Sequence, residues 1–354
     1  MIRCAVVGAS GYSGAELVRL LARHPLADLV SVQADSSAGE RWEDLHPHAR
    51  HLFRGRIERL DVEALRGLDV VFLALPHGES ARVAGKLAGR VGAVIDLSGD
   101  LRLEDAESYR AWYGREHEAP DLLGRAVYGL PELFGADLPG ATLVACAGCY
   151  ATAIQLAAAP ALGLSDAVES DIIAAAVSGT TGAGRKADTA LSFSEVAGNL
   201  RAYRVGRHQH IPEIVMGLRR RSGREVRLTF VPHLAPIPRG ILATVVLRTT
   251  RTIPPEELVA AYERAYESAP FVRIVDPAER LPEVRDVVGT NFCDIAPVVD
   301  HAAASVVVVA VLDNLGKGAA GQGVQVMNAV LGLPEITGLV SPADRPRAEV
   351  VVHG

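Results

Sequence analysis

The chain has 354 residues, of which 49% are hydrophobic and 22% charged, and its net charge at pH 7 is −6. A chain of this length exceeds one ordinary hydrophobic core, so we expect two domains, and its mild negative charge argues against nucleic acid as the main partner. The sequence has no apolar run long enough to span a membrane, no signal-like opening, and four scattered cysteines that form no disulfide framework. We therefore expect a cytoplasmic protein without a membrane partner.

The first part of the chain alternates short apolar runs with helical spacing. We predict strands at residues 2–7, 29–33, 70–75, 92–97 and 142–145, and a helix at 14–23. Because these strands are almost entirely apolar, the pattern indicates an α/β fold with a parallel sheet covered on both faces.

The pattern changes after the helix that begins near residue 150. Long β-branched strands are predicted at 171–177, 227–231, 241–248 and 304–312, with helices at 255–268 and 319–331. They favour an α+β domain with a mixed or antiparallel sheet, which often pairs with a second subunit. The predicted parts are a dinucleotide-binding domain at 1–148, a catalytic and oligomerisation domain at 149–313, and a C-terminal segment at 314–354 that packs back on the first domain.

A glycine-rich loop, Gly8-Ala-Ser-Gly-Tyr-Ser-Gly14, joins the first strand to the first helix. Glycines at this place permit a tight turn and the close approach of a pyrophosphate to backbone N–H groups, although a plain turn is the alternative. The predicted cofactor contacts are Gly8, Ser10, Gly11, Tyr12 and Ser13.

The second strand ends at Ala34-Asp35-Ser36, which is the usual place for ribose recognition. Asp35 is suited to a ribose hydroxyl and so to NAD, whereas Ser36 is suited to the 2′-phosphate of NADP. No arginine stands beside them in the sequence, so these residues leave the choice of nicotinamide cofactor open.

Cys149 follows a strand and a glycine turn and begins a helix, where the helix dipole favours a nucleophilic thiolate. A buried structural cysteine and a redox pair with Cys146 are the alternatives. A thioester chemistry needs a proton-transfer partner, and His208 and His210 supply imidazoles with Glu213 three residues further on.

Two other segments carry groups suited to an anionic substrate. The stretch 178–186 combines backbone donors, hydroxyls and cations, although a mobile hairpin tip is the alternative reading. A further arginine, Arg102, follows a predicted strand at the sheet edge where open α/β sheets bind ligands. The predicted substrate contacts are Arg102, Ser178, Gly182, Arg185, Lys186 and Glu213, and no metal site is predicted.

Together these motifs resemble the N-acetyl-gamma-glutamyl-phosphate reductases of arginine biosynthesis, over nearly the whole chain. Besides the glycine loop, the matching stretches are Asp96-Leu-Ser-Gly-Asp-Leu-Arg102, Tyr128-Gly-Leu-Pro-Glu132, Gly148-Cys-Tyr-Ala-Thr152, Ser178-Gly-Thr-Thr-Gly-Ala-Gly-Arg-Lys186, His208-Gln-His-Ile-Pro-Glu213 and Asp313-Asn-Leu-Gly-Lys-Gly318. The resemblance implies the plan of aspartate-semialdehyde dehydrogenase, with a Rossmann-type NADP-binding domain, a second α+β domain, and a homodimer or homotetramer.

The resemblance also implies roles. Cys149 would attack the acyl phosphate and expel phosphate, and NADPH would reduce the thioester to N-acetyl-glutamate semialdehyde. His210 is the expected acid/base and His208 the second choice. Asn314 would lie near the nicotinamide, and Arg102 near the substrate phosphate.

One residue departs from the family pattern. Ala147 precedes Gly148 where a proline is usual, and alanine there resembles sister enzymes that reduce a substrate attached to a carrier protein. The stretch 178–186 instead resembles the enzymes acting on the free acetylated compound, which we take as the main expectation. A carrier-linked substrate and a non-catalytic nucleotide-sensing protein are the alternatives.

Overall fold

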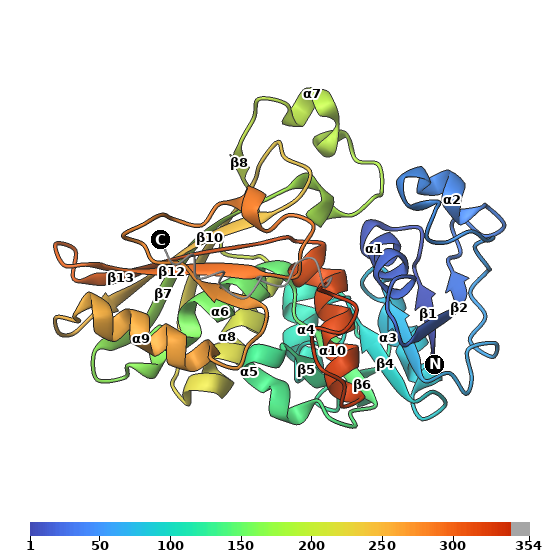
Figure 1. The fold of residues 1–354 in the computed structure, drawn as a ribbon, viewed down its shortest axis with the longest axis horizontal. Helices are drawn as coiled ribbons and strands as arrows, with labels where there is room; N and C mark the ends of the chain where they lie inside the picture. Colours follow the sequence, from blue (N-terminus) through green and yellow to red (C-terminus); the bar gives the residue numbers. More distant parts are fainter. Residues whose placement is uncertain (341–354) are drawn as a thin grey trace, which may run out of the picture.

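The computed structural model describes residues 1–340; residues 341–354, the end of the expected C-terminal segment, lie outside the described residues. The chain forms two sheets side by side, with the first in blue and cyan at the right of Figure 1 and the second in green to orange at the left. No helix within residues 1–340 is long and apolar enough to cross a bilayer.

The first sheet has six parallel strands in the order β2-β1-β3-β4-β6-β5. Helices α1 and α10 pack on one face through Leu17, Leu21 and Val324, and helix α3 covers the other through Val83 and Leu87. The two-sided covering explains why the inner strands β3 and β6 are apolar throughout. The elements are β1 (Ile2–Val7), α1 (Tyr12–Leu21), β2 (Ala27–Gln33), β3 (Val70–Leu73), α3 (Glu79–Leu87), β4 (Ala93–Asp96), β5 (Val127–Gly129), β6 (Leu143–Cys146) and α10 (Gly321–Val330).

The second sheet has seven strands in the order β11-β12-β13-β10-β7-β9-β8 and is mixed, because β7 pairs with β9, and β11 with β12, in parallel. Helices α6, α8 and α9 cover one face, below the strands in Figure 1. The elements are α6 (Cys149–Gly163), β7 (Val168–Ser178), β8 (Arg201–Ala202), α8 (His210–Ser222), β9 (Arg227–Leu234), β10 (Ile241–Thr249), α9 (Pro255–Tyr266), β11 (Val272–Ile274), β12 (Cys293–Asp300) and β13 (Ser305–Leu312).

Strand β7 shows how one face of this sheet is selected. Ile172, Ala174 and Ala176 are buried against the helices, whereas Ile173 between them is exposed. This alternation is the two-residue period of a strand with one covered face. The segment with α7 (Phe193–Val196) projects on the other side of the sheet from these helices, at the top of Figure 1.

Short helical elements stand between the longer ones. The π-helix η7 (Gly316–Ala320) precedes α10, so the last helix begins at Gly321, two residues later than the sequence indicates. The others are α2 (Trp42–Leu45), α4 (Ala106–Tyr113), α5 (Pro131–Phe134) and the 3-10 turns η1 (Pro47–Ala49), η2 (Pro120–Leu122), η3 (Gly135–Asp137), η4 (Thr180–Ala183), η5 (Thr189–Leu191) and η6 (Val284–Asp286).

Strand β12 is the longest strand that the sequence did not predict. Its Pro297 lacks the N–H of a ladder donor, which argues against a strand in a sequence. Strand β11 pairs with β12 only from Cys293 to Ile295. Beyond Ile295 this edge of β12 is open within residues 1–340, so the missing N–H of Pro297 leaves no residue of β11 without a donor.

Candidate active site

Cys149 lies where β6 leads through Gly148 into α6. Gly148 has extended backbone angles and is the N-cap, so Cys149 is the first helical residue, as predicted. Its side chain is half-buried, while Cys4, Cys146 and Cys293 are buried. A Cβ on Gly318 of η7 would come within 2.8 Å of the Cys149 Cβ, so only a glycine lets this turn approach the thiol so closely.

A buried carboxylate and a buried guanidinium hold the turn before Cys149. Glu213 Oε1 accepts hydrogen bonds from Gly148 N–H at 2.7 Å and from the Tyr128 hydroxyl at 2.8 Å. Arg102 Nη1 pairs with Glu213 Oε2 at 3.3 Å. Arg102 also donates to the carbonyls of Cys146 and Leu97, both at 2.8 Å. The turn is therefore fixed from two directions by charges that neutralise each other.

His210 lies against the same turn. Its Nε2 is 3.4 Å from Arg102 Nη1, and a Cβ on Gly148 would come within 2.5 Å of Nε2. The other ring nitrogen, Nδ1, is buried and has no hydrogen-bond partner among residues 1–340. His210 thus directs an imidazole at the residue next to Cys149, and this placement follows from its position as the first residue of α8.

His208 stands behind His210. Its Nδ1 accepts the His210 backbone N–H at 3.1 Å, and its ring contacts that of His210 with centroids 4.8 Å apart. Tyr150, Tyr203 and Phe230 surround the His208 ring edge-on, at centroid distances of 5.5, 5.7 and 5.3 Å. The aromatic enclosure fits a residue that supports His210 rather than one that meets the substrate.

Burial sets the protonation states of this group. Desolvation raises the pKa of the Cys149 thiol to about 11, against the opposing charge of Arg102. Desolvation, together with the Arg102 charge, also lowers the pKa of His210 well below its usual value. Desolvation is likewise the main cause that lowers the pKa of His208, to about 2. In this structure Cys149 is a thiol at neutral pH. Burial therefore opposes the thiolate that the helix N-terminus favours.

The glycine loop has the shape of a cradle. Gly8 has φ +90°, and a Cβ there would lie 2.3 Å from the Ala74 carbonyl oxygen. A Cβ on Gly14 would lie 2.2 Å from the Gly8 carbonyl oxygen, so neither position accepts a side chain. Gly11 is the N-cap of α1, Ser10 and Ser13 are half-buried, and Tyr12 is exposed. The loop fits a dinucleotide pyrophosphate at a helix N-terminus.

Asp35 at the end of β2 lines an open cavity of about 520 Å³. Its Oδ1 accepts the Leu60 N–H at 3.3 Å, while the neighbouring Ala34 is buried and Ser36 exposed. Helix α3 brings the cations Arg82 and Lys86 to the same cavity, which sequence adjacency did not indicate. The lining residues are Asp35, Leu60, Asp61, Val62, Glu63, Arg82, Lys86 and Arg90.

The predicted substrate segment 178–186 divides between two surroundings. Asn314 Nδ2 donates to the Thr181 hydroxyl at 2.9 Å, and its Oδ1 accepts the Gly240 N–H at 2.7 Å. A Cβ on Gly182 would lie 3.1 Å from Ser178 Oγ, so these residues form one group. Arg185 Nη1 instead donates to the Ser10 carbonyl at 2.9 Å, in the cofactor loop, and Lys186 is exposed.

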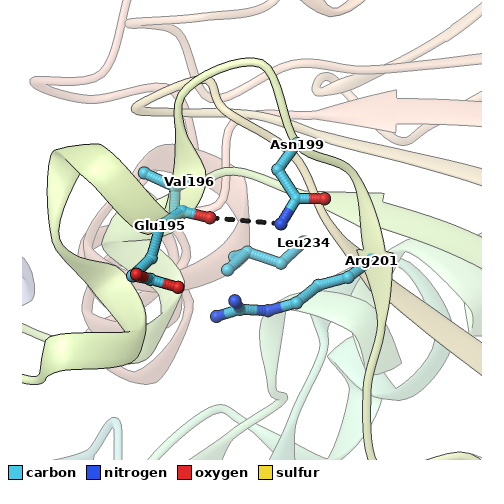
Figure 2. Close-up of a pocket in the computed structure, with 5 residues that line it drawn as sticks. All are labelled: Glu195, Val196, Asn199, Arg201 and Leu234. Carbon is cyan, nitrogen blue, oxygen red and sulfur yellow. Dashed lines mark hydrogen bonds between the residues drawn. The ribbon is translucent and has the colours of Figure 1, made fainter.

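Sequence reasoning missed residues that the fold brings to the site from elsewhere in the chain. They are Tyr113, Tyr128, Gln155 and Gly318, of which Gln155 donates to the Tyr128 hydroxyl at 2.8 Å. Figure 2 shows a separate narrow pocket at α7 and β8, where Asn199 Nδ2 donates to the Glu195 carbonyl at 3.1 Å. None of the predicted site residues lines it, and it has no room for a water molecule.

Comparison with known families and proteins agrees with this geometry. Residues 3–141 match the family described as semialdehyde dehydrogenase, NAD binding domain, and residues 149–314 the family described as semialdehyde dehydrogenase, dimerisation domain. An N-acetyl-gamma-glutamyl-phosphate reductase of Symbiobacterium thermophilum is 46% identical over 350 residues, covering 96% of this chain and 98% of its own. That of Pelotomaculum thermopropionicum is 44% identical over 346 residues, covering 98% and 99%. The chain belongs to the N-acetyl-gamma-glutamyl-phosphate reductase family.

Solved structures support the fold assignment of this family member. Aspartate semialdehyde dehydrogenase II of Vibrio cholerae, complexed with ASA, superimposes with a TM-score of 0.67 at 17% identity, covering 93% of this chain and 98% of that one. The enzyme of Candida albicans with NADP gives 0.65 at 15% identity, covering 93% and 98%. The family, the fold class, the assignment to the phosphorylating semialdehyde dehydrogenases and the NADP(H)-type cofactor expected from the sequence are therefore confirmed.

Proposed function

We propose that this enzyme reduces N-acetyl-gamma-glutamyl phosphate to N-acetyl-glutamate 5-semialdehyde and phosphate, through a thioester on Cys149. The observation that carries the proposal is the group around Gly148: the Cys149 thiol begins α6, and His210 Nε2 and Arg102 Nη1 lie against Gly148. The substrate is the one in the relatives' name. A half-buried thiol beside an imidazole and a fixed cation suits acyl transfer from an anionic acyl phosphate.

The residues divide the chemistry between them. Sγ of Cys149 forms a bond to the acyl carbon, its proton passes to His210 Nε2, and the carbon–oxygen bond to phosphate breaks. Arg102 offsets the phosphate charge. Burial is the main cause that lowers the pKa of His210 and the Arg102 cation is the second, and the phosphate charge offsets the effect of Arg102. As the acyl group is reduced, the protonated His210 gives its proton to the carbonyl oxygen. His210 then takes this proton back and returns it to Sγ as the carbon–sulfur bond breaks, which releases the semialdehyde and restores the Cys149 thiol.

The loop 8–14 and the end of β2 would hold NADP(H), which supplies hydride to the thioester when bound. Gly8, Ser10, Gly11, Tyr12 and Ser13 would face the pyrophosphate, and Asp35 and Ser36 the ribose, with Ala34 contributing only backbone. Asn314 would lie near the nicotinamide. Ser178, Gly182 and Lys186 would bind the substrate, with Glu213 fixing Gly148. Arg185 would join the two loops through Ser10.

The test is the reverse reaction, in which N-acetyl-glutamate semialdehyde reduces NADP in the presence of phosphate or arsenate, with NAD in parallel. We expect rapid turnover by the wild type, and a loss of at least about 1,000-fold in Cys149→Ala with NADPH binding retained. A Cys149→Ala enzyme that keeps more than a few per cent of the rate would remove Cys149 from this role. Absence of wild-type turnover with NADPH still bound would favour a carrier-linked substrate, or a nucleotide sensor.

The structure bears on the carrier-linked alternative through Ala147. Its side chain is buried, and its backbone N–H donates to the Gly129 carbonyl at 3.2 Å, a bond that proline could not make. Ala147 therefore acts on the packing of the β6–α6 turn and not on a surface that a carrier would touch. This favours the free acetylated substrate.

A homodimer, or a homotetramer built from it, is the second part of the proposal. Ile173 is 52% exposed on the sheet face opposite the helices, and in register with it across β10 and β13 stand Val246 and Val307. An apolar stripe of this kind on a sheet fits a second copy. Ile173→Asp is expected to halve the mass measured by sedimentation, and an unchanged mass would exclude this face as the subunit interface.

We also place the enzyme in the cytoplasm, where the free thiols at Cys4, Cys146, Cys149 and Cys293 stay reduced.

A further inference from the structure

Tyr113 presents a polar group that none of residues 1–340 satisfies. It is the last residue of α4, which ends at Gly114 in the left-handed conformation at φ +69°. Its ring stacks on Tyr109, with centroids 4.5 Å apart and planes within 8°, and meets the His77 ring edge-on at 5.2 Å. Its hydroxyl is buried and has no hydrogen-bond partner among residues 1–340. A buried donor without a partner in an otherwise fixed side chain calls for a ligand.

The hydroxyl points at the segment that carries Arg102. A Cβ on Gly99 would lie 2.2 Å from Tyr113 Oη, so the hydroxyl rests against the Gly99 backbone, and a side chain there would displace it. The Gly99 N–H donates to His77 Nδ1 at 3.1 Å, which fixes this backbone. Burial raises the pKa of Tyr113 above its usual value, and Arg102 is the largest opposing charge. The hydroxyl therefore keeps its proton as a donor beside Arg102.

Arg102 cannot bind a phosphoryl group fully by itself. Of its five N–H groups, one each is directed to Cys146, Leu97, Glu213 and His210, which leaves one. The Gly148 N–H is also unavailable, because Glu213 accepts it. A phosphoryl group has three outer oxygens, so a further donor near Arg102 is needed to satisfy them.

We propose that the Tyr113 hydroxyl donates a hydrogen bond to the phosphoryl group of the acyl-phosphate substrate, and to inorganic phosphate in the reverse reaction, beside Arg102. This rests on the proposed function above, since it concerns the leaving group of that reaction. Tyr113 is thus a substrate-binding residue that the sequence pattern did not single out.

Tyr109 provides a matched control on the same helix. Its ring stacks on that of Tyr113, but its hydroxyl donates to Asp100 Oδ1 at 2.8 Å. Asp100 also accepts the N–H groups of Gly78 and Ala81, at the start of α3. Removing the Tyr109 hydroxyl thus breaks a bond within the protein, whereas removing the Tyr113 hydroxyl breaks none.

The experiment compares Tyr113→Phe with Tyr109→Phe and the wild type. For Tyr113→Phe we expect the KM for acyl phosphate and for inorganic phosphate to rise about tenfold, the NADPH dissociation constant to stay unchanged, and Tm to equal or exceed that of the wild type. For Tyr109→Phe we expect a lower Tm with both KM values unchanged. An unchanged phosphate KM in Tyr113→Phe, or a lowered Tm, would overturn the proposal.

A binding measurement separates this proposal from the proposed function. Inorganic phosphate should protect Cys149 from iodoacetamide, and this readout needs no turnover. We expect Tyr113→Phe to require about tenfold more phosphate for equal protection. Protection that needs Tyr113 in an enzyme without turnover would keep the phosphate site and reject the reaction. Turnover together with phosphate protection that Tyr113→Phe leaves unchanged would keep the proposed reaction and reject the Tyr113 contact with phosphate.

Discussion

Glu213 accepts the backbone N–H of Gly148 at 2.7 Å, and this one bond ties helix α8 to the turn that presents Cys149. The same carboxylate pairs with Arg102, which itself holds the carbonyls of Cys146 and Leu97. The carboxylate is fully buried. One side chain thus holds the turn before Cys149, balances the charge of Arg102 and orients the N-terminus of α6, so replacing it affects all three.

Glu213→Gln tests this coupling. The amide keeps an acceptor for Gly148 N–H but turns an NH₂ group toward Arg102, which leaves the guanidinium without its counter-charge. We expect a loss of about 3 kcal/mol in the free energy of unfolding and a fall in kcat of roughly 10- to 100-fold. Urea unfolding and steady-state kinetics measure the two.

Tyr128→Phe is the control for this prediction. It removes one hydrogen bond that Glu213 accepts and the one that Gln155 donates to the hydroxyl, and it leaves the bonds to Gly148 and Arg102 in place. We expect a loss of about 2 kcal/mol in stability with little change in kcat. Equal kinetic effects of the two substitutions would show that Glu213 does not act through Gly148.

Cys149 alkylation should follow the raised pKa of its thiol. Because the pKa is about 11, the thiolate fraction is small at neutral pH and rises with pH. We expect the iodoacetamide rate at Cys149 to rise about tenfold for each pH unit between 7 and 10. Mass spectrometry of the labelled peptide identifies the site, and Cys149→Ala should lose this label. A rate that levels off below pH 8 would mean that the helix N-terminus outweighs burial after all.

Arg185 should act on the cofactor loop, because it donates to the Ser10 carbonyl. We expect Arg185→Ala to weaken NADPH binding about fivefold, which corresponds to the loss of about 1 kcal/mol for one such hydrogen bond. The neighbouring Lys186 is exposed, and Lys186→Ala should leave NADPH binding unchanged. Fluorescence titration with NADPH compares the two. Equal effects would indicate that general loop charge, and not the Ser10 contact, is responsible.

The sequence predicted those features whose signals are local. A strand, a glycine turn and a helix around Cys149 are contiguous, as are the loop 8–14 and the pair His208 and His210. Tyr113 and Tyr128 could not be found in this way, because separate elements bring them to Arg102 and Glu213 from different parts of the chain. The pKa of the Cys149 thiol has the same limit: the helix start that favours the thiolate is visible in the sequence, whereas the burial that raises the pKa is a property of the packed structure.

His208 should make stability depend on pH below neutrality. Its pKa falls from 6.5 to about 2 on folding, so below pH 6.5 the unfolded chain binds a proton that the folded protein does not. Stability is therefore lost as pH falls, by about 2 kcal/mol for this residue between pH 7 and 5. His210 acts in the same direction. Asp96, whose pKa burial raises to about 6, opposes them, because its folded carboxyl binds the proton first.

His208→Phe isolates the contribution of His208 to this pH dependence, because Asp96 and His210 remain in both proteins. The substitution loses the bond that His208 Nδ1 accepts from His210 N–H, so stability at pH 7 should be lower. Between pH 7 and 5, however, the variant should lose about 2 kcal/mol less than the wild type in urea unfolding. His301→Phe, in the exposed turn after β12, reports the effect of removing an imidazole from the surface. If the wild type and His208→Phe lose equal stability over this range, His208 takes up its proton in the folded state, and its aromatic enclosure does not keep it neutral.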